Sequence, residues 1–302
     1  MSSAQRKSQV SQSAFDIHQH ITDQIVAAIE RGPGDFQLPW HSRGNIMAPK
    51  NIVSKKSYRG VNVVALWAAS YNRGYSSGVW GTYKQWAEAG AQVRRGEKSS
   101  YVVFYKELEY ANPDAESGDE TETRLFARAT PVFSAEQVDG YDLATANTPT
   151  MIEPIAAADA LVKASRAVIH HGGSRAYYRP STDEIQLPAI TDFVGTPTST
   201  AQEAYYSTLL HELTHWTSHA TRCDRQLGKR FGDNAYAMEE LIAELGAAFL
   251  CAELGVTIEP RDDHAQYLAS WLKVLKADKK AIFTAASKAS QAATWLQTVA
   301  SG

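Results

Sequence analysis

Two histidines and a glutamate have the spacing needed for metal-assisted hydrolysis. Residues 211–215 read His-Glu-Leu-Thr-His. On a helix, positions i and i+4 share one face, so His211 and His215 can direct their imidazoles at one ion. Glu212 lies about 100° around the helix from His211, within reach of a water held there. These groups can ionise a zinc-bound water at neutral pH. The alternative is a pair of surface histidines on an amphipathic helix.

The residues around this pentapeptide favour a helix. Residues 202–216 contain neither Gly nor Pro, and Leu209, Leu213 and Trp216 form one apolar stripe. A hydroxyl residue within 198–200 can cap the start of the helix, with Gln or Glu three residues further on. The sequence therefore predicts that the motif lies on a helix whose other face is buried.

A third metal ligand is expected from a second helix, over residues 238–250. Glu240 and Glu244 are four residues apart on one face of it, beside an apolar set. Unpaired carboxylates are costly there, so we favour Glu240 as a ligand and Glu244 as the group that orients a ligating histidine, an assignment that can be exchanged. The alternative is two solvated glutamates. Other histidines are weaker ligand candidates: His170, His171 and His219.

Length and composition describe an ordinary globular protein. The chain has 302 residues, enough for two compact domains, with 44% hydrophobic and 21% charged residues. No run of apolar residues is long enough to span a membrane, and the first residues lack a signal-peptide apolar region. The two cysteines, Cys223 and Cys251, form no C-x-x-C pair. We therefore expect a cytoplasmic protein without a membrane partner.

Charge is divided unevenly along the chain, although the net charge is only −3. Residues 1–106 hold 14 Lys or Arg against 6 Asp or Glu, whereas residues 107–123 hold seven acids and no base. The remainder is mildly acidic. This pattern predicts a basic front, an acidic loop at 107–123 and a back region with different partners.

Basic and aromatic residues alternate in the front region. Cations that follow a backbone and rings that stack on unpaired bases are what single-stranded nucleic acid requires. The alternative is a small α+β domain with an ordinary aromatic core and a basic rim. The candidate contacts are Trp40, Lys50, Lys55, Lys56, Tyr58, Arg59, Asn62, Trp80, Arg94, Arg95 and Lys98.

Periodicity predicts the remaining elements. Apolar residues at helical spacing indicate a helix over 13–30, and Val102–Phe104 indicate a strand. A helix from 154 should lead into a strand near 167–171, followed by a hairpin that turns at 180–183. This strand region could offer an edge to an extended peptide. One or two packed helices are expected over 265–299.

Several motifs in combination resemble a known family. The front motifs are Tyr58-Arg59-Gly60-Val61-Asn62, Trp80-Gly81-Thr82-Tyr83 and Gly90-Ala91-Gln92-Val93-Arg94-Arg95-Gly96-Glu97-Lys98. The back motifs are residues 205–217 around the His-Glu-Leu-Thr-His sequence and residues 239–246. Together these motifs resemble the ArdC-type antirestriction proteins of conjugative plasmids, whose N-terminal domain also occurs in TraC-type primases.

The resemblance implies an α+β protein with an N-terminal single-stranded DNA-binding domain followed by a zincin-like metalloprotease domain. We place these domains at 1–145 and 146–302. It also implies protection of incoming plasmid DNA from host restriction during conjugation. By similarity to gluzincins, Glu240 is the third ligand, and Glu244 stands where many such enzymes carry Asp.

The leading hypothesis is a DNA-associated metallopeptidase acting on an unidentified protein or peptide. His211, His215 and Glu240 would hold Zn²⁺, or another divalent transition metal such as Mn²⁺, and Glu212 would act as general base. The rival is a non-enzymatic protein that coats single strands and has a structural or vestigial metal site. A primase accessory module is disfavoured because the sequence has no nucleotidyl-transfer carboxylates or phosphate-loop motif.

Overall fold

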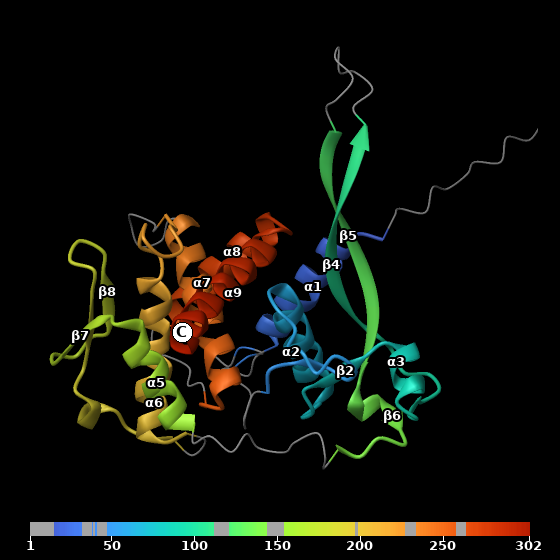
Figure 1. The fold of residues 1–302 in the computed structure, drawn as a ribbon, viewed down its shortest axis with the longest axis horizontal. Helices are drawn as coiled ribbons and strands as arrows, with labels where there is room; N and C mark the ends of the chain where they lie inside the picture. The colour runs from blue at the N-terminus through green and yellow to red at the C-terminus, as the bar shows by residue number, and fades with distance from the viewer. Residues whose placement is uncertain are drawn as a thin grey trace, which may run out of the picture.

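The computed structural model describes residues 15–31, 38, 40, 47–111, 121–143, 154–196, 199–226, 234–257 and 264–302. Helices and strands are mixed along the chain, which confirms the α+β class. In Figure 1 the first helices and the largest sheet lie at one end, and the histidine-bearing helix and a small sheet lie at the other. The long C-terminal helices lie between them.

The N-terminal half begins with two buried helices, α1 (Ile17–Glu30) and α2 (Val61–Arg73). Helix α1 starts later than predicted because the Asp16 side chain caps it, accepting hydrogen bonds from the backbone N–H groups of His18 and Gln19. Helix α2 ends at Gly74, whose φ of 70° suits glycine. The apolar faces of the two helices pack on each other and on the sheet.

The largest sheet has the strand order β1-β2-β5-β4. Its strands are β1 (Lys50–Asn51), β2 (Val79–Gly81), β4 (Ser100–Ala111) and β5 (Thr121–Ser134). β1 and β2 are parallel, and β5 is antiparallel to both β2 and β4. The long β4–β5 hairpin extends away from the helices (Figure 1).

The predicted acidic loop at 107–123 is shorter than expected. β4 runs to Ala111 and β5 begins at Thr121, so both ends of that segment are paired strand. The register pairs Glu107 with Leu125 and Glu109 with Thr123. Backbone pairing therefore includes Glu107, Glu109 and Glu122, which the composition alone had indicated as loop. Residues 112–120 lie outside the described part.

Short elements close the base of the hairpin. They are α3 (Tyr83–Glu88), β3 (Gln92–Val93), the 3₁₀ turn η1 (Ala135–Gln137) and β6 (Val138–Asp139). Helix α3 has a capping box in which Thr82 and Gln85 satisfy each other's backbone N–H groups. Trp86 is buried in the small cluster beneath it.

The C-terminal half combines a three-stranded sheet with five helices in the described residues. The first elements are α5 (Pro154–Ser165), β7 (Val168–His171), β8 (Tyr177–Arg179), β9 (Glu184–Leu187) and the 3₁₀ turn η2 (Ile190–Asp192). The later helices are α6 (Ala201–Trp216), α7 (Asn234–Leu254), α8 (His264–Ala277) and α9 (Ala281–Ser301). The sheet order is β7-β9-β8, and β8 and β9 form the predicted hairpin.

One continuous apolar core joins the two halves. It contains Ile21 and Val64 from α1 and α2, and Leu245, Trp271 and Ile282 from α7, α8 and α9. The segment with the expected boundary at 145 lies outside the described residues, so that boundary stays a prediction. None of the helices in the described part is long and apolar enough to cross a lipid bilayer.

Candidate metal centre

Helix α6 carries the two histidines as the sequence predicts. Thr200 caps the helix through the backbone N–H of Glu203, whose side chain in turn accepts from the Thr200 N–H at 2.8 Å. His211 and Glu212 are buried at 3% and 2% exposure, whereas His215 is half-buried. The site is therefore enclosed on the His211 side and accessible beside His215.

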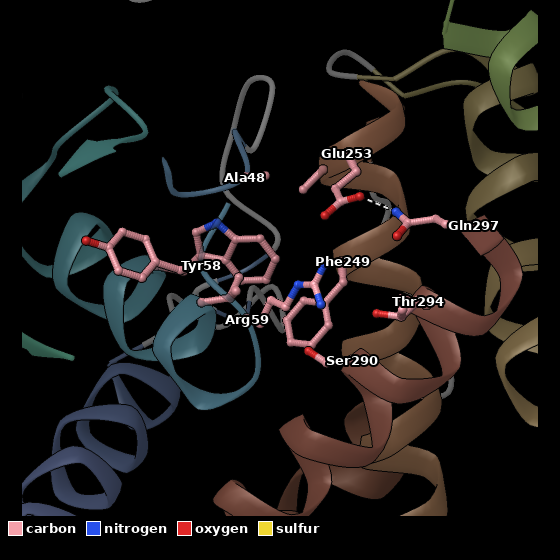
Figure 2. A pocket seen from close by; sticks show the side chains of 12 residues that line it. Ala48, Tyr58, Arg59, Phe249, Glu253, Ser290, Thr294 and Gln297 are labelled. Carbon is pink, nitrogen blue, oxygen red and sulfur yellow. Dashed lines mark hydrogen bonds between the residues drawn. The ribbon is translucent and has the colours of Figure 1, made fainter. Parts of the chain in front are cut away.

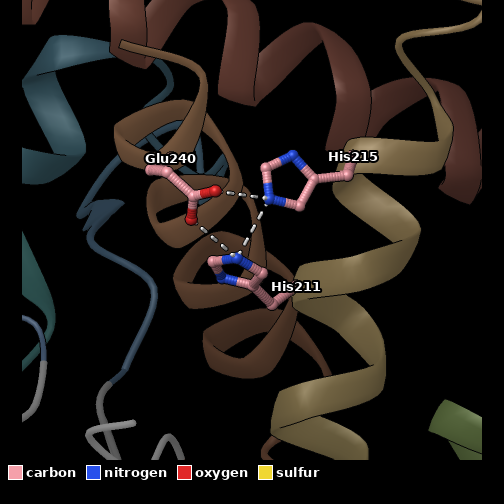
Figure 3. Close-up of side chains that lie close together, drawn as sticks. All are labelled: His211, His215 and Glu240. Atoms are coloured by element: carbon pink, nitrogen blue, oxygen red, sulfur yellow. Dashed lines mark hydrogen bonds and ion pairs between the residues drawn. The ribbon is translucent and has the colours of Figure 1, made fainter. Parts of the chain in front are cut away.

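Helix α7 brings a carboxylate to the two rings. The Glu240 carboxylate oxygens lie 3.6 Å from His211 Nε2 and 3.7 Å from His215 Nε2. The two Nε2 atoms are 3.2 Å apart. Figure 3 shows the rings of α6 facing this carboxylate from the neighbouring helix. One ligand atom from each residue lies within 4.8 Å of the others.

This spacing fits a small divalent cation. Two nitrogens at 2.0–2.1 Å from a tetrahedral ion are separated by about 3.3 Å, close to the observed nitrogen separation. Glu240 lies a few tenths of an ångström further out, a distance that a small carboxylate rotation removes. Two imidazole nitrogens and one carboxylate oxygen are a common donor set for zinc in hydrolases. His211, His215 and Glu240 could therefore hold the ion together.

A glycine lets the two site helices approach closely. A Cβ atom at Gly246 of α7 would collide with the side chain of Thr214 on α6. Thr214 lies between the two histidines of the motif and is completely buried. The close approach at Gly246 therefore helps to set the distance between the histidines and Glu240.

The second nitrogen of His211 faces Glu244. Glu244 Oε2 lies 3.7 Å from His211 Nδ1, and Glu244 Oε1 accepts a 3.0 Å hydrogen bond from the Trp40 indole. His211 Nδ1 has no hydrogen-bond partner in this arrangement. Glu244 is thus placed to orient the His211 ring, which supports the role favoured for it from the sequence.

The second nitrogen of His215 faces a carboxylate that the sequence reasoning missed. Glu239 Oε1 lies 3.3 Å from His215 Nδ1. Arg225, buried in the loop after α6, donates from Nη2 to Glu239 Oε1 at 2.9 Å and from Nε to Oε2 at 3.2 Å. It also donates to Thr217 Oγ1 and to the Thr214 carbonyl. Both rings therefore have a carboxylate behind them.

Electrostatics in this cluster favour ionised carboxylates around a cation. Burial lowers the pKa of His215, but the charge of Glu240 and hydrogen bonds with Glu239 and Glu240 outweigh this and raise it to about 10. Burial pushes the pKa of Glu240 upward, but His215 and His211 hold it well below its usual range. The cluster attracts positive charge, as a metal site must.

Glu212 is placed on the same helix turn, and its charge contributes to the raised pKa of His215. The other histidines lie elsewhere. His170 pairs with Glu184 at 3.4 Å, His171 bonds the Tyr205 hydroxyl at 2.9 Å, and His219 bonds Thr221. These three histidines therefore each have a local partner away from the cluster on α6 and α7.

Three of the predicted nucleic-acid contacts are structural. Trp40 and Trp80 are fully buried, and Asn62 is 8% exposed. Trp40 bonds Glu244, while the Asn62 amide both donates to and accepts from the Val103 backbone. In this conformation the expectation that these residues contact bases is wrong, because tertiary packing uses their rings and amides internally.

The other predicted contacts lie at the surface or partly so. Tyr58 is half-buried, and the exposed residues are Lys50, Lys55, Lys56, Arg59, Arg94, Arg95 and Lys98. Arg94 donates to Glu97 Oε1 at 3.0 Å and to the backbone carbonyls of Glu136 and Val138. The role of the exposed residues in nucleic-acid binding stays a prediction.

A pocket lies where α2 meets α7 and α9 (Figure 2). Tyr58, Arg59, Trp67, Phe249 and Glu253 are among its lining residues. The Trp67 and Phe249 rings are 5.7 Å apart across the two halves. Two predicted nucleic-acid contacts, Tyr58 and Arg59, thus lie at the junction between the halves.

Two family models match the chain. Residues 15–133 match the N-terminal domain of the anti-restriction factor ArdC, and residues 156–288 match a zincin-like metallopeptidase. The second match includes all residues of the metal centre except Trp40. The order of the two matches agrees with the order expected from the sequence.

Two relatives align with most of this chain. The chain is 47% identical over 296 residues to the uncharacterised protein y4eC of Sinorhizobium fredii, covering 94% of this chain and 92% of that protein. It is 37% identical over 287 residues to a DNA primase TraC of Escherichia coli. That match covers 90% of this chain but 19% of the primase, so the chain corresponds to one part of TraC.

Two solved structures share the fold and are 39–40% identical in sequence to this chain. The metal-free structure of the antirestriction protein ArdC from plasmid R388 superposes with a TM-score of 0.77 at 40% identity, covering 95% of this chain and 98% of that one. Its Mn(II)-bound structure gives 0.75 at 39% identity, covering 95% and 99%. The chain therefore belongs to the ArdC family of antirestriction proteins, with an ArdC N-terminal domain followed by a zincin-like domain.

Proposed function

We propose that this protein binds single-stranded DNA and carries a zinc-dependent peptidase site, and that it protects incoming plasmid DNA from host restriction during conjugation. The observation that carries the peptidase proposal is the pair of Nε2 atoms 3.2 Å apart with the Glu240 carboxylate beside both. Membership of the ArdC family supports the antirestriction role.

In this proposal His211, His215 and Glu240 hold the ion, and a neighbouring carboxylate orients each histidine. A bound divalent ion supplies Lewis-acid chemistry, polarising a carbonyl and acidifying water. Glu212 accepts a proton from the attacking water and returns it to the leaving amine. Zn²⁺ fits the donor set, and Mn²⁺ is the alternative that the R388 structure supports.

The exposed cations of the N-terminal half support binding to a polyanion. Lys50, Lys55, Lys56 and Arg59 are exposed, and Arg59 lines the pocket at the junction of the two halves. Cations at such positions neutralise phosphates regardless of base sequence. Binding of this kind would bring the peptidase site to DNA that enters as a single strand.

The test uses the purified full-length protein. Zn²⁺ and Mn²⁺ affinities are measured by calorimetry, casein cleavage is assayed with and without EDTA, and binding of a labelled oligo-dT is followed by anisotropy. We expect metal binding, EDTA-sensitive cleavage and salt-dependent DNA binding. If the protein binds metal but cleaves no casein, either with or without oligo-dT, this result would contradict the peptidase proposal.

Metal affinity is expected to rise with pH. Histidine must be neutral to bind a metal, and the pKa of His215 is raised to about 10. Between neutral pH and that value each ion should displace about one proton, so affinity should increase about ten-fold per pH unit. Calorimetry in buffers with different ionisation enthalpies measures the proton release. Affinity independent of pH over this range would contradict the prediction.

The same shift sets the pH dependence of stability without metal. The folded-state pKa of His215 is raised above its ordinary value of 6.5. Its protonation therefore stabilises the metal-free fold fully below about pH 6.5, and this contribution is lost as pH rises through about 10. Metal-loaded protein should lose less stability over that range. Urea denaturation of both forms measures the difference.

Replacing Trp40 by Phe should weaken metal binding although Trp40 comes from the N-terminal half. The change removes the indole N–H that bonds Glu244 at 3.0 Å, so Glu244 holds the His211 ring less firmly. Loss of such outer partners typically weakens metal affinity about 10- to 100-fold, and we expect the lower end because Trp40 acts through Glu244. Calorimetry with Zn²⁺ measures the effect.

Trp86→Phe is the matched control. Trp86 is also fully buried and donates its indole N–H, at 3.0 Å to the Phe133 carbonyl, in a cluster of the N-terminal half. Both variants lose one buried hydrogen bond, but only Trp40→Phe should change metal affinity. Equal metal affinities for the two variants would show that Trp40 has only a packing role.

A further inference from the structure

The β4–β5 hairpin exposes two phenylalanine rings on one face, where sheet side chains are usually covered or polar. Phe104 is 51% exposed and Phe126 is 58% exposed. The strand register places Phe104 opposite Arg128 and Lys106 opposite Phe126. Side chains directly opposite in an antiparallel pair point to the same face. These four residues, here the hairpin face, therefore form one surface in which each ring has a cation beside it.

The other face of the hairpin packs against the protein body. Val103 is buried in the main core, and Tyr105, although 49% exposed, places its hydroxyl 3.1 Å from His18 Nε2 of α1. Successive residues of a strand alternate between faces, so Phe104 and Lys106 point away from α1. The exposure of the hairpin face is thus fixed by the register and not by fraying of the strands.

Toward the base of the hairpin, the same face becomes buried. Val102 and Val132 pack there with Leu66 of α2, and Tyr58 and Tyr75 lie partly buried at the edge of this cluster. The Arg73 guanidinium lies 6.0 Å from the Tyr75 ring centroid. Tyr58, Tyr75 and the Arg73 guanidinium therefore lie at the edge of the cluster that the base of the hairpin face joins.

Beyond Lys106, the sequence of the chain becomes acidic. Residues 107–123 hold seven acids and no base in the sequence. A phosphate backbone is repelled by such a segment and attracted by Lys106 and Arg128. A polyanion is therefore attracted to the stretch of the hairpin that carries Lys106 and Arg128.

We propose that the hairpin face is a stacking platform for single-stranded DNA, on which Phe104 and Phe126 each stack on a base and Lys106 and Arg128 contact phosphates. This inference rests on the proposed DNA binding and assigns it a surface. Diagonal neighbours on one sheet face are roughly 7–8 Å apart, so two rings can hold neighbouring unstacked bases. Sheet-borne aromatics stack two or three bases in RNA-recognition domains.

The composition of the hairpin face disfavours a protein partner. The buried centre of a protein–protein interface is depleted of charged residues, Lys included, although aromatic residues and Arg are enriched in interfaces. Here each ring has a cation opposite it on the partner strand and another two residues away on its own strand, so the two rings do not form a continuous apolar surface. Base stacking with phosphate neutralisation uses all four side chains.

The main test compares the double variant Phe104→Leu/Phe126→Leu with wild type, using full-length protein and labelled oligo-dT. Leucine keeps the site apolar but cannot stack as a ring does. We expect affinity to fall by about ten-fold or more per ring. The double variant Lys106→Ala/Arg128→Ala should also reduce the slope of log affinity against log salt by about 0.7 per cation. Val168→Leu, another exposed apolar side chain, is the control.

The outcomes separate this inference from the proposed function. If wild type does not bind oligo-dT, the proposed DNA binding fails. If wild type binds and the leucine variant binds equally well, the hairpin face is not the platform. A leucine variant that changes the oligomeric state in gel filtration, but not DNA affinity, would identify a protein interface and overturn the inference. Photocrosslinking of an iododeoxyuridine-substituted oligonucleotide to residues 100–106 or 126–132 of the wild-type protein would support the inference without any variant that could fail to fold.

Discussion

Replacing Glu212 by Gln is expected to slow peptide cleavage by roughly a hundred- to ten-thousand-fold, the usual contribution of a general base. The amide has the shape of the carboxylate but cannot accept a proton. Because Glu212 is 2% exposed, an isosteric change is also the least disruptive one at this position. The loss should appear in kcat/KM for a protein or peptide substrate, with metal content measured in parallel.

Glu203→Gln provides a control on the same helix. Glu203 accepts hydrogen bonds from the backbone N–H groups of Thr200 at 2.8 Å and Thr257 at 3.2 Å, through different carboxylate oxygens, and glutamine can keep the capping bond to Thr200 while it loses the bond to Thr257. This variant should keep both metal and activity. A metal-loaded Glu212→Gln protein that cleaves as fast as wild type would exclude the proposed general base.

The same residue separates the peptidase from its rival, a protein that protects DNA only by coating it. A structural metal site does not need a general base. If cells that express Glu212→Ala protein protect incoming DNA fully, coating explains protection and the metal site serves another purpose. If protection is lost while oligo-dT binding is retained, proteolysis is required.

Local sequence patterns predicted the helices of the site well. The His211–His215 spacing, a capping hydroxyl within 198–200 and the carboxylates of the second helix all lie where helical geometry places them. Both glutamates lie beside the same apolar helix face, so the choice of Glu240 over Glu244 as the ligand rests on the similarity to gluzincins. The structure puts Glu240 beside both Nε2 atoms and Glu244 behind one ring.

The outer partners of the histidines could not be found in the same way. Trp40 is more than 200 residues from Glu244 in sequence, and Arg225 reaches Glu239 from a loop. Such contacts depend on tertiary packing, and the spacing of residues along one helix does not reveal them. Glu239 had one usable signal, its position next to Glu240 on the same buried helix.

Composition was a poor guide to which aromatics face solvent. Trp40 and Trp80 stand beside basic or flexible positions in the sequence, yet both are buried. Phe104, which follows two valines in a strand, reads as core but is half-exposed. The pairing register of β4 and β5 decides which face of the hairpin Phe104 lies on. Because the hairpin extends beyond the body of the protein, a residue on that face need not be buried.

The largest stability effect is expected at Arg225. Arg225→Met leaves the buried Glu239 carboxylate without its bidentate partner and removes the donors to Thr217 and the Thr214 carbonyl. Removing one member of a buried ion pair costs about 3–5 kcal/mol, because the remaining charge is uncompensated. Urea denaturation of the metal-free protein measures the loss in free energy of unfolding.

A double-mutant cycle shows whether the ion pair causes this loss. Glu239→Met in the Arg225→Met background removes the stranded charge, so the double variant should recover part of the stability that the single variant loses. Arg225→Lys keeps the charge but not the two parallel hydrogen bonds, and should lie between wild type and Arg225→Met. If the double variant is as unstable as the sum of the single changes, Arg225 stabilises the end of α6 and not Glu239. In that case Arg225→Met should leave metal affinity unchanged. If Arg225 instead holds Glu239 against His215, Arg225→Met should weaken metal affinity.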